Sequence, residues 1–245
     1  MQIDSDDLFI NENLFDICYE EAEKNNMDIL EFSGFRRYRE NISLIRQPII
    51  PLYLKYKYNN LFVTQPKLSS FVYTFTSNIV IRLIDGYLWG KCIRNEIYKK
   101  TLDTLGEDIY TRKMFYGDDR LVVFVLFKVA NSFKFINLYG IAYNYSPTSI
   151  MHVNDTKIRN CHDELFNIMS IYNYTKNTSD IIIAAYEIVH RWKTIIFPGL
   201  NEDNKQYLNQ LMEKLVKSPQ MTEYYKRRLI FYWETIKNET NIPKI

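Results

Sequence analysis

The spacing of hydrophobic positions divides the chain into a mixed first part and a helical second part. In the first part, short apolar runs predict strands at 28–35, 79–84 and 133–138. Leu14, Cys18 and Ala22 recur at helical spacing and predict a helix that Asn11 caps, and Asn95 is a candidate cap for a second helix through residue 100. The run 121–127 is apolar throughout, so its periodicity fits a buried helix and a buried strand equally.

From about residue 155 onward the pattern is helical, with caps expected at Ser179 and Asp180 and breaks at Pro198-Gly199 and Ser218-Pro219. The helices are predicted at 161–173, 179–194, 202–217 and 220–237. Residues 36–78 contain three prolines and are expected to form an extended excursion. We therefore predict an α/β fold in residues 1–154, with a mixed sheet and flanking helices, followed by a helical region at 155–245.

Composition narrows the functional class. The chain has 245 residues, 47% of them hydrophobic, which is enough for a sizeable core. Its net charge of +2 gives no case for nucleic-acid binding. Three widely spaced cysteines suggest neither a zinc site nor a disulfide framework. No apolar run reaches membrane-spanning length, so the default expectation is a cytoplasmic protein without a transmembrane segment.

An acidic cluster at Asp4, Ser5, Asp6 and Asp7 is the strongest candidate for chemistry. If the segment is extended, Asp4 and Asp6 point to the same face and could direct two carboxylates at one divalent cation. The alternative is an ordinary acidic helix start, because negative charge suits a helix N-terminus.

Several segments then follow in a recognisable order. Asp28-Ile29-Leu30-Glu31-Phe32 comes first and Leu88-Trp89-Gly90-Lys91 much later. Gly117-Asp118-Asp119 then precedes the apolar run, and Tyr143-Asn144-Tyr145-Ser146 leads to Ser149. Together with Ile3-Asp4-Ser5-Asp6-Asp7, this order resembles the second half of a family 2 glycosyltransferase with the GT-A fold. Each motif is short, and the resemblance covers about residues 1–150.

The resemblance implies a role for each matching residue. Asp4 and Asp6 would hold Mn²⁺ or Mg²⁺ against the diphosphate of a sugar donor, and a late His152 could complete the metal shell. Asp119, or else Asp118, would be the general base, whereas the simpler reading makes them a capping pair. Trp89 and Lys91 would border the acceptor pocket and bind substrate, whereas the simpler reading makes them a core and a surface residue.

The implied function is transfer of a sugar from a nucleotide-sugar donor to a hydroxyl of a glycan, protein or lipid-linked acceptor, with inversion. The family also implies a nucleotide-binding half before the acidic cluster, so we expect the chain to need a separately encoded N-terminal half or to form a homo-oligomer. The alternative is a non-catalytic remnant that binds or scaffolds. Basic and aromatic residues at 223–233 leave open peripheral contact with a membrane surface.

Overall fold

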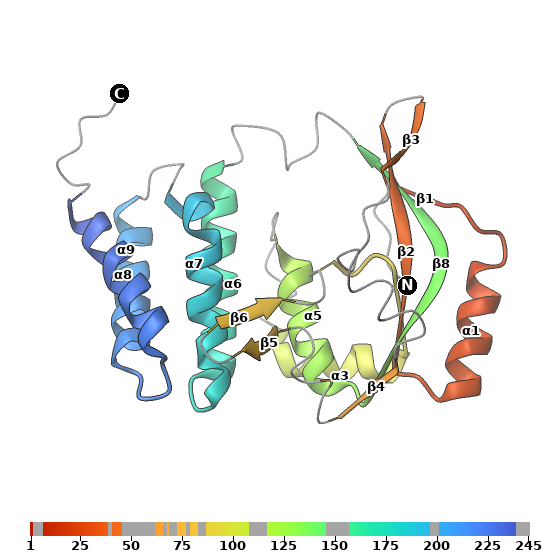
Figure 1. Ribbon diagram of the computed structural model, residues 1–245, viewed down its shortest axis with the longest axis horizontal. Coiled ribbons are helices and arrows are strands. Elements are labelled where there is room, and N and C mark those ends of the chain that lie inside the picture. Colours follow the sequence, from red (N-terminus) through yellow and green to blue (C-terminus); the bar gives the residue numbers. More distant parts are fainter. Residues whose placement is uncertain are drawn as a thin grey trace. The chain divides into compact units, whose positions relative to one another are not determined.

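The computed structural model describes residues 1, 7–38, 41–45, 62–65, 68, 73–76, 79–82, 87–107, 117–145, 157–196 and 201–238. The described parts form a mixed α/β architecture with a helical C-terminal region, as the hydrophobic pattern predicts (Figure 1). The chain divides into two compact units. One is built from Met1–Thr74, Arg82–Lys113 and Asp119–His152, and the other is mainly Val153–Ile245.

The first unit is organised around a sheet in which two long strands lie side by side. Strand β2 pairs in parallel with β8, while β1 pairs antiparallel with the other edge of β8. Strands β3 and β7 pair antiparallel with β2, and β4 pairs antiparallel with β8. The strands are β1 (Leu8–Phe9), β2 (Ile29–Tyr38), β3 (Asn41–Ile45), β4 (Phe62–Thr64), β7 (Lys91–Ile93) and β8 (Ser132–Tyr145). A separate two-stranded sheet joins β5 (Tyr73–Thr76) to β6 (Ile79–Arg82).

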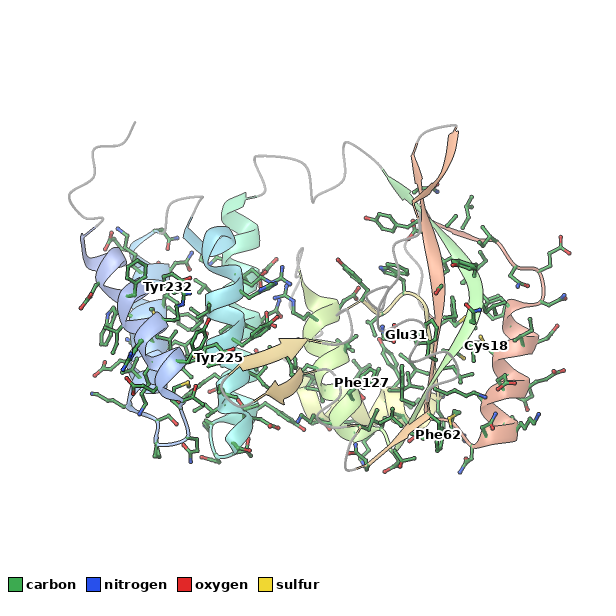
Figure 2. The ribbon with its side chains drawn as sticks, viewed as in Figure 1. Cys18, Glu31, Phe62, Phe127, Tyr225 and Tyr232 are labelled. Atoms are coloured by element: carbon green, nitrogen blue, oxygen red, sulfur yellow. The ribbon has the colours of Figure 1, made fainter. Side chains whose placement is uncertain are left out.

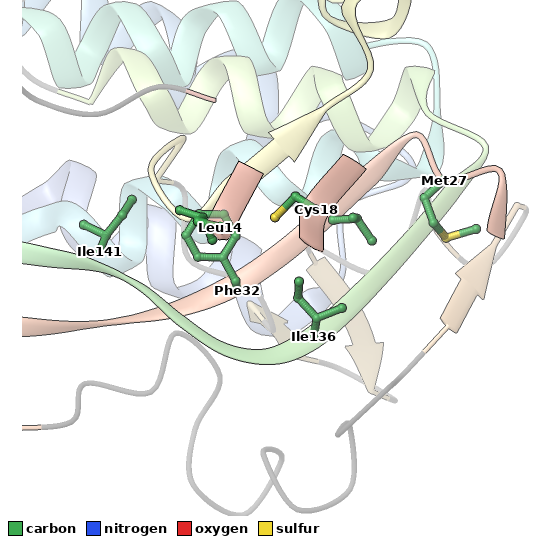
Figure 3. Close-up of a cluster of buried hydrophobic side chains, with 7 residues drawn as sticks. Leu14, Cys18, Met27, Phe32, Ile136 and Ile141 are labelled. Carbon is green, nitrogen blue, oxygen red and sulfur yellow. The ribbon is translucent and has the colours of Figure 1, made fainter. Parts of the chain in front are cut away.

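One face of the sheet is covered by α1 (Leu14–Asn25). Leu14 and Cys18 pack against Phe32 of β2 and Ile141 of β8 in a buried cluster (Figure 3). Successive side chains of a strand point to opposite faces, so the side chains on either side of Phe32 must face away from α1. The helix begins two residues later than a cap at Asn11 would place it. Asn13 occupies the cap position without a side-chain hydrogen bond, while Asn11 accepts the N–H of Asn13 at 2.9 Å.

The ambiguous run 121–127 is a buried helix, α5 (Asp118–Val129). It follows the turn at Gly117, whose φ of +76° suits a glycine. Most of its side chains between Leu121 and Phe127 are buried, and Phe127 meets Phe133 of β8 with ring centroids 5.3 Å apart. Helix α3 (Asn95–Leu105) begins at Asn95 itself, so Arg94 holds the cap position that the sequence assigned to Asn95.

The second unit contains the four helices that the sequence predicts. They are α6 (Lys157–Thr175), α7 (Ile182–Ile196), α8 (Glu202–Lys217) and α9 (Glu223–Asn238), with a short 3-10 turn, η3 (Ser179–Ile181), before α7. Thr178, rather than Ser179 or Asp180, supplies the cap of η3 by accepting the N–H of Asp180. Among the described residues, no helix combines the length and apolar character needed to cross a membrane.

Candidate active site

The candidate site is built around a tight turn at Tyr87–Gly90 that leads into β7. Gly90 has a φ of +77°, a left-handed conformation that favours glycine. Its carbonyl accepts the N–H of Phe32 at 2.8 Å, so the turn is attached directly to the central strand. We call residues 87–90 the site turn.

The site turn carries a stack of aromatic side chains. Trp89 lies between Tyr87 and Tyr143, with ring centroids 5.5 Å and 6.1 Å away and an interplanar angle of 24° in each case. Tyr87 is exposed, and Trp89 and Tyr143 are partly buried. Such a stack offers an aromatic face to a ligand while its other surface packs on protein. Sequence reasoning named Trp89 but not Tyr87 as a member of the site.

The candidate base meets the same turn. Asp119, in the first turn of α5, accepts the backbone N–H of Leu88 through Oδ2 at 3.4 Å. Asp119 is partly exposed, whereas the side chain of its neighbour Asp118 lies outside the described residues. The structure therefore brings the segments of Asp119 and Trp89, which are 30 positions apart in sequence, together through the backbone amide of Leu88.

Lys91 is placed differently from the sequence expectation. Its side chain has no solvent exposure, so the reading that makes it a surface residue is wrong. The Nζ atom donates to the carbonyl of Tyr87 at 2.7 Å and lies 3.4 Å from Oε2 of Glu31, which is equally buried. Glu31 is a site residue that sequence reasoning missed. The available signal was a carboxylate between the apolar residues Leu30 and Phe32 of a predicted strand.

The acidic cluster reaches the site through its last member. Asp4 and Asp6 lie outside the described residues, as does His152. Asp7 is buried and accepts the backbone N–H of Asn144 through Oδ1 at 2.8 Å. Because Asn144 follows Tyr143, this bond attaches the end of the acidic cluster to the strand that contributes Tyr143 to the aromatic stack. Within the described part of the chain, no group of three or more His, Cys, Asp or Glu side chains could hold a metal ion.

Two cysteines meet in the buried cluster beneath α1. Cys18 of α1 is buried, and Cys92 of β7 packs partly exposed against the same cluster. A hydrogen bond from the Cys18 thiol lowers the pKa of Cys92 to about 7 and correspondingly raises the pKa of Cys18. Figure 2 shows Cys18 and Glu31 on opposite sides of β2, and Trp89 of the site turn packs against the same cluster as Cys92.

Comparison with solved structures shows that this fold is similar to that of S. aureus TarS, a glycosyltransferase. The structure of TarS 1-349 in complex with UDP-GlcNAc matches with a TM-score of 0.56 at 13% identity, covering 97% of this chain and 66% of that chain. Two further structures, TarS and TarS 1-349, each give a TM-score of 0.50 at 12% identity over 97% of this chain, covering 39% and 65% of theirs.

The chain thus spans just under two thirds of TarS 1-349. No protein-family model matches the sequence, and no curated protein matches it either. At these identities the likeness establishes the fold.

Proposed function

We propose that this chain is a glycosyltransferase, or the acceptor-side part of one, that moves a sugar from a nucleotide-sugar donor to an acceptor hydroxyl. The observation that supports this most is the convergence of separate segments on the site turn. Asp119 is bonded to Leu88, Trp89 stacks on Tyr143, and the next residue, Asn144, binds Asp7. The fold in which they converge is shared with a glycosyltransferase.

In the proposed reaction, Asp119 is the general base. The acceptor oxygen forms a bond to the anomeric carbon while its proton passes to the Asp119 carboxylate. The bond from that carbon to the donor phosphate breaks, and the nucleoside diphosphate leaves with the electron pair. Attack opposite the leaving group inverts the anomeric configuration. The Leu88 amide holds Oδ2 of Asp119 in place, which orients the carboxylate toward the acceptor.

The aromatic stack supplies a surface for the acceptor. A sugar ring can lie against the exposed edge of Tyr87 and the indole of Trp89, so that its hydroxyl is held near Asp119. Lys91 does not contact this surface while it is held by Tyr87 and Glu31, so we assign acceptor binding to the aromatic side chains.

The donor is proposed from the similarity to TarS, and the metal from the acidic cluster in the sequence. TarS has been crystallised with UDP-GlcNAc, which makes a nucleoside-diphosphate sugar the first donor to test here. Asp4 and Asp6, with His152, are the residues proposed to hold Mn²⁺ or Mg²⁺. Such a cation stabilises the charge of a departing diphosphate.

The test is a transfer and hydrolysis assay with a panel of nucleotide sugars, beginning with UDP-GlcNAc. It is run on the chain alone and on the chain co-expressed with a polypeptide that supplies the part of the TarS 1-349 fold that this chain does not cover. We expect turnover in the second sample and its loss in Asp119→Asn. Asp103→Asn, on the exposed side of α3, is the matched control and should keep full activity.

The outcomes separate the two candidate functions. Turnover that persists in Asp119→Asn overturns the assignment of the base. Donor or acceptor binding without turnover in either sample favours the non-catalytic binding protein instead.

A further inference from the structure

Glu31 and Lys91 form a charged pair with no access to solvent. Both side chains are 0% exposed, and Nζ of Lys91 lies 3.4 Å from Oε2 of Glu31. The two residues are directly opposite each other in the antiparallel pairing of β2 with β7, so their side chains share one face of the sheet. Removing two charges from water is costly, and a hydrophobic pair of similar size often stabilises a fold as well. Stability alone therefore does not explain why this charged pair is buried here.

The pair holds the site turn at its first residue. The same Nζ that meets Glu31 donates to the carbonyl of Tyr87 at 2.7 Å, four positions earlier in the chain. At the other end of the turn, the carbonyl of Gly90 is bound by the N–H of Phe32. Both ends of the turn are thus attached to β2, one through a backbone bond and the other through the ammonium of Lys91.

What lies between these attachments is the functional part of the turn. The N–H of Leu88 points to Oδ2 of Asp119, and the ring of Trp89 stacks between two tyrosines. A displacement of the Tyr87 carbonyl would move both groups, because Leu88 is the next residue. Catalytic groups must be held to within about half an ångström of their working geometry.

We propose that Glu31 and Lys91 are positioning residues. They fix the site turn so that the Leu88 amide orients Asp119 and Trp89 keeps its place in the aromatic stack. The inference rests on the proposed function only in so far as it treats Asp119 as the general base. The geometric part can be tested without any turnover. Neither residue reaches a substrate, since both are enclosed.

The test replaces both charges by neutral side chains of similar shape, in Glu31→Gln/Lys91→Met. Double replacement avoids leaving one charge buried alone, which is the change that unfolds proteins. The matched control is Glu21→Gln/Lys134→Met. It removes the ion pair between α1 and β8 on the other face of the sheet, where Nζ lies 2.6 Å from Oε2.

Two readouts report the geometry directly. The first is hydrogen exchange of the Leu88 amide by NMR, which we expect to become at least about tenfold faster in the site variant. Exchange at Phe133 and Ile141 in the core should stay unchanged. The second is acrylamide quenching of Trp89 in a background where Trp192 and Trp233 are Phe, which should increase. The control pair should leave both readouts at the wild-type values.

A third readout joins the inference to catalysis. Where the wild type transfers sugar, kcat of the site variant should fall by about 10- to 100-fold while KM for the donor stays within about twofold. Unchanged exchange and quenching in the site variant overturn the positioning role, whatever the activity. A wild type without turnover, but with the expected exchange and quenching changes, refutes the proposed function and leaves the positioning role supported.

If the site variant does not fold, hydrogen exchange of the Leu88 amide in the wild type tests the proposal instead. A Leu88 amide that exchanges as fast as an unstructured peptide overturns the proposal, and a protected Leu88 amide supports it.

Discussion

Gly34 of β2 lies directly against the indole of Trp89. A Cβ atom built on Gly34 would be 3.3 Å from Cζ3 of Trp89 and 2.8 Å from the carbonyl oxygen of Ile141. The second distance is shorter than real Cβ contacts, and the atom it meets belongs to the backbone of β8, which cannot rotate away. The missing side chain thus allows β2, β8 and the site turn to approach one another.

We predict that Gly34→Ala lowers the free energy of unfolding by about 1–3 kcal/mol, the usual cost of overfilling a packed site. Because Trp89 must also move, its fluorescence maximum should shift. Urea unfolding followed by tryptophan fluorescence measures both effects. Lys100→Ala, on the exposed side of α3, is the control and should change stability by less than about 0.5 kcal/mol. Wild-type stability in Gly34→Ala would contradict the close approach.

Cys92 should be the most reactive thiol of the described residues. Its pKa is lowered to about 7, mainly by the hydrogen bond from Cys18, whereas burial raises the pKa of Cys161 to about 11. The thiolate is the reactive form, so alkylation of Cys92 by iodoacetamide should reach half its limiting rate near pH 7. Peptide mass spectrometry over pH 5–10 follows each site separately.

The Cys18→Ala variant tests the cause of that shift. Without the donor thiol, the midpoint for Cys92 should rise toward the ordinary value of 9.0. An unchanged midpoint would show that Cys18 does not stabilise the thiolate.

The ion pair between Glu21 and Lys134 should make the attachment of α1 dependent on pH. The hydrogen bond from Lys134 lowers the pKa of Glu21 below 4.5. A carboxyl whose pKa is depressed by folding stabilises the protein above its unfolded pKa, and this contribution is lost as pH falls through the folded value. Glu21→Gln should therefore cost about 0.2–1 kcal/mol at pH 7 and progressively less below about pH 4.

Urea titrations at pH 7 and at pH 3 measure this difference. The control is Glu213→Gln, which removes an exposed i,i+4 pair with Lys217 on α8 and should cost about 0.3–0.5 kcal/mol or less at pH 7. A Glu21→Gln deficit that is equally large at both pH values would argue against the electrostatic origin.

Metal binding is predicted at the acidic cluster. We expect weak binding of Mn²⁺ by calorimetry, because two carboxylates alone make a poor cage for a divalent cation. The affinity should rise when UDP is added, since the diphosphate provides further oxygen ligands. Asp4→Ala/Asp6→Ala should abolish binding, and Asp103→Ala should not affect it. Identical Mn²⁺ isotherms in the wild type and in the Asp4/Asp6 double variant would refute this prediction.

The elements that the sequence predicted well are those whose signal is local. The helical stripes of the second unit depend on residues three and four apart, and α8 occupies 202–217 as expected. The run 121–127 could not be decided locally, because an apolar segment buried on all sides has the same pattern as a strand or a helix. Its packing against Phe133 of β8 determines the answer.

The sequence could nominate candidate site residues only where the side chain itself has a recognisable chemistry. Asp119 and Trp89 could be named from sequence, but the bond that joins their segments uses the backbone amide of Leu88, which any residue would provide. The burial of Lys91 could not be predicted from the sequence either. It depends on Glu31, whose place opposite Lys91 is set by strand pairing across 60 positions of sequence.

The parallel pairing of β2 with β8 also determines when the molecule can fold. The N–H of Asp28 donates to the hydroxyl of Ser132, 104 positions later. During synthesis at about 5–20 residues per second, β2 therefore leaves the ribosome roughly 5–20 s before its main partner exists. Throughout that interval, α1 can cover one face of β2 and β3 can pair with its C-terminal end, but the edge of β2 that β8 will occupy stays open. The nascent chain is most prone to aggregation at β2 during this interval. A chaperone that binds extended apolar segments would therefore bind β2 first.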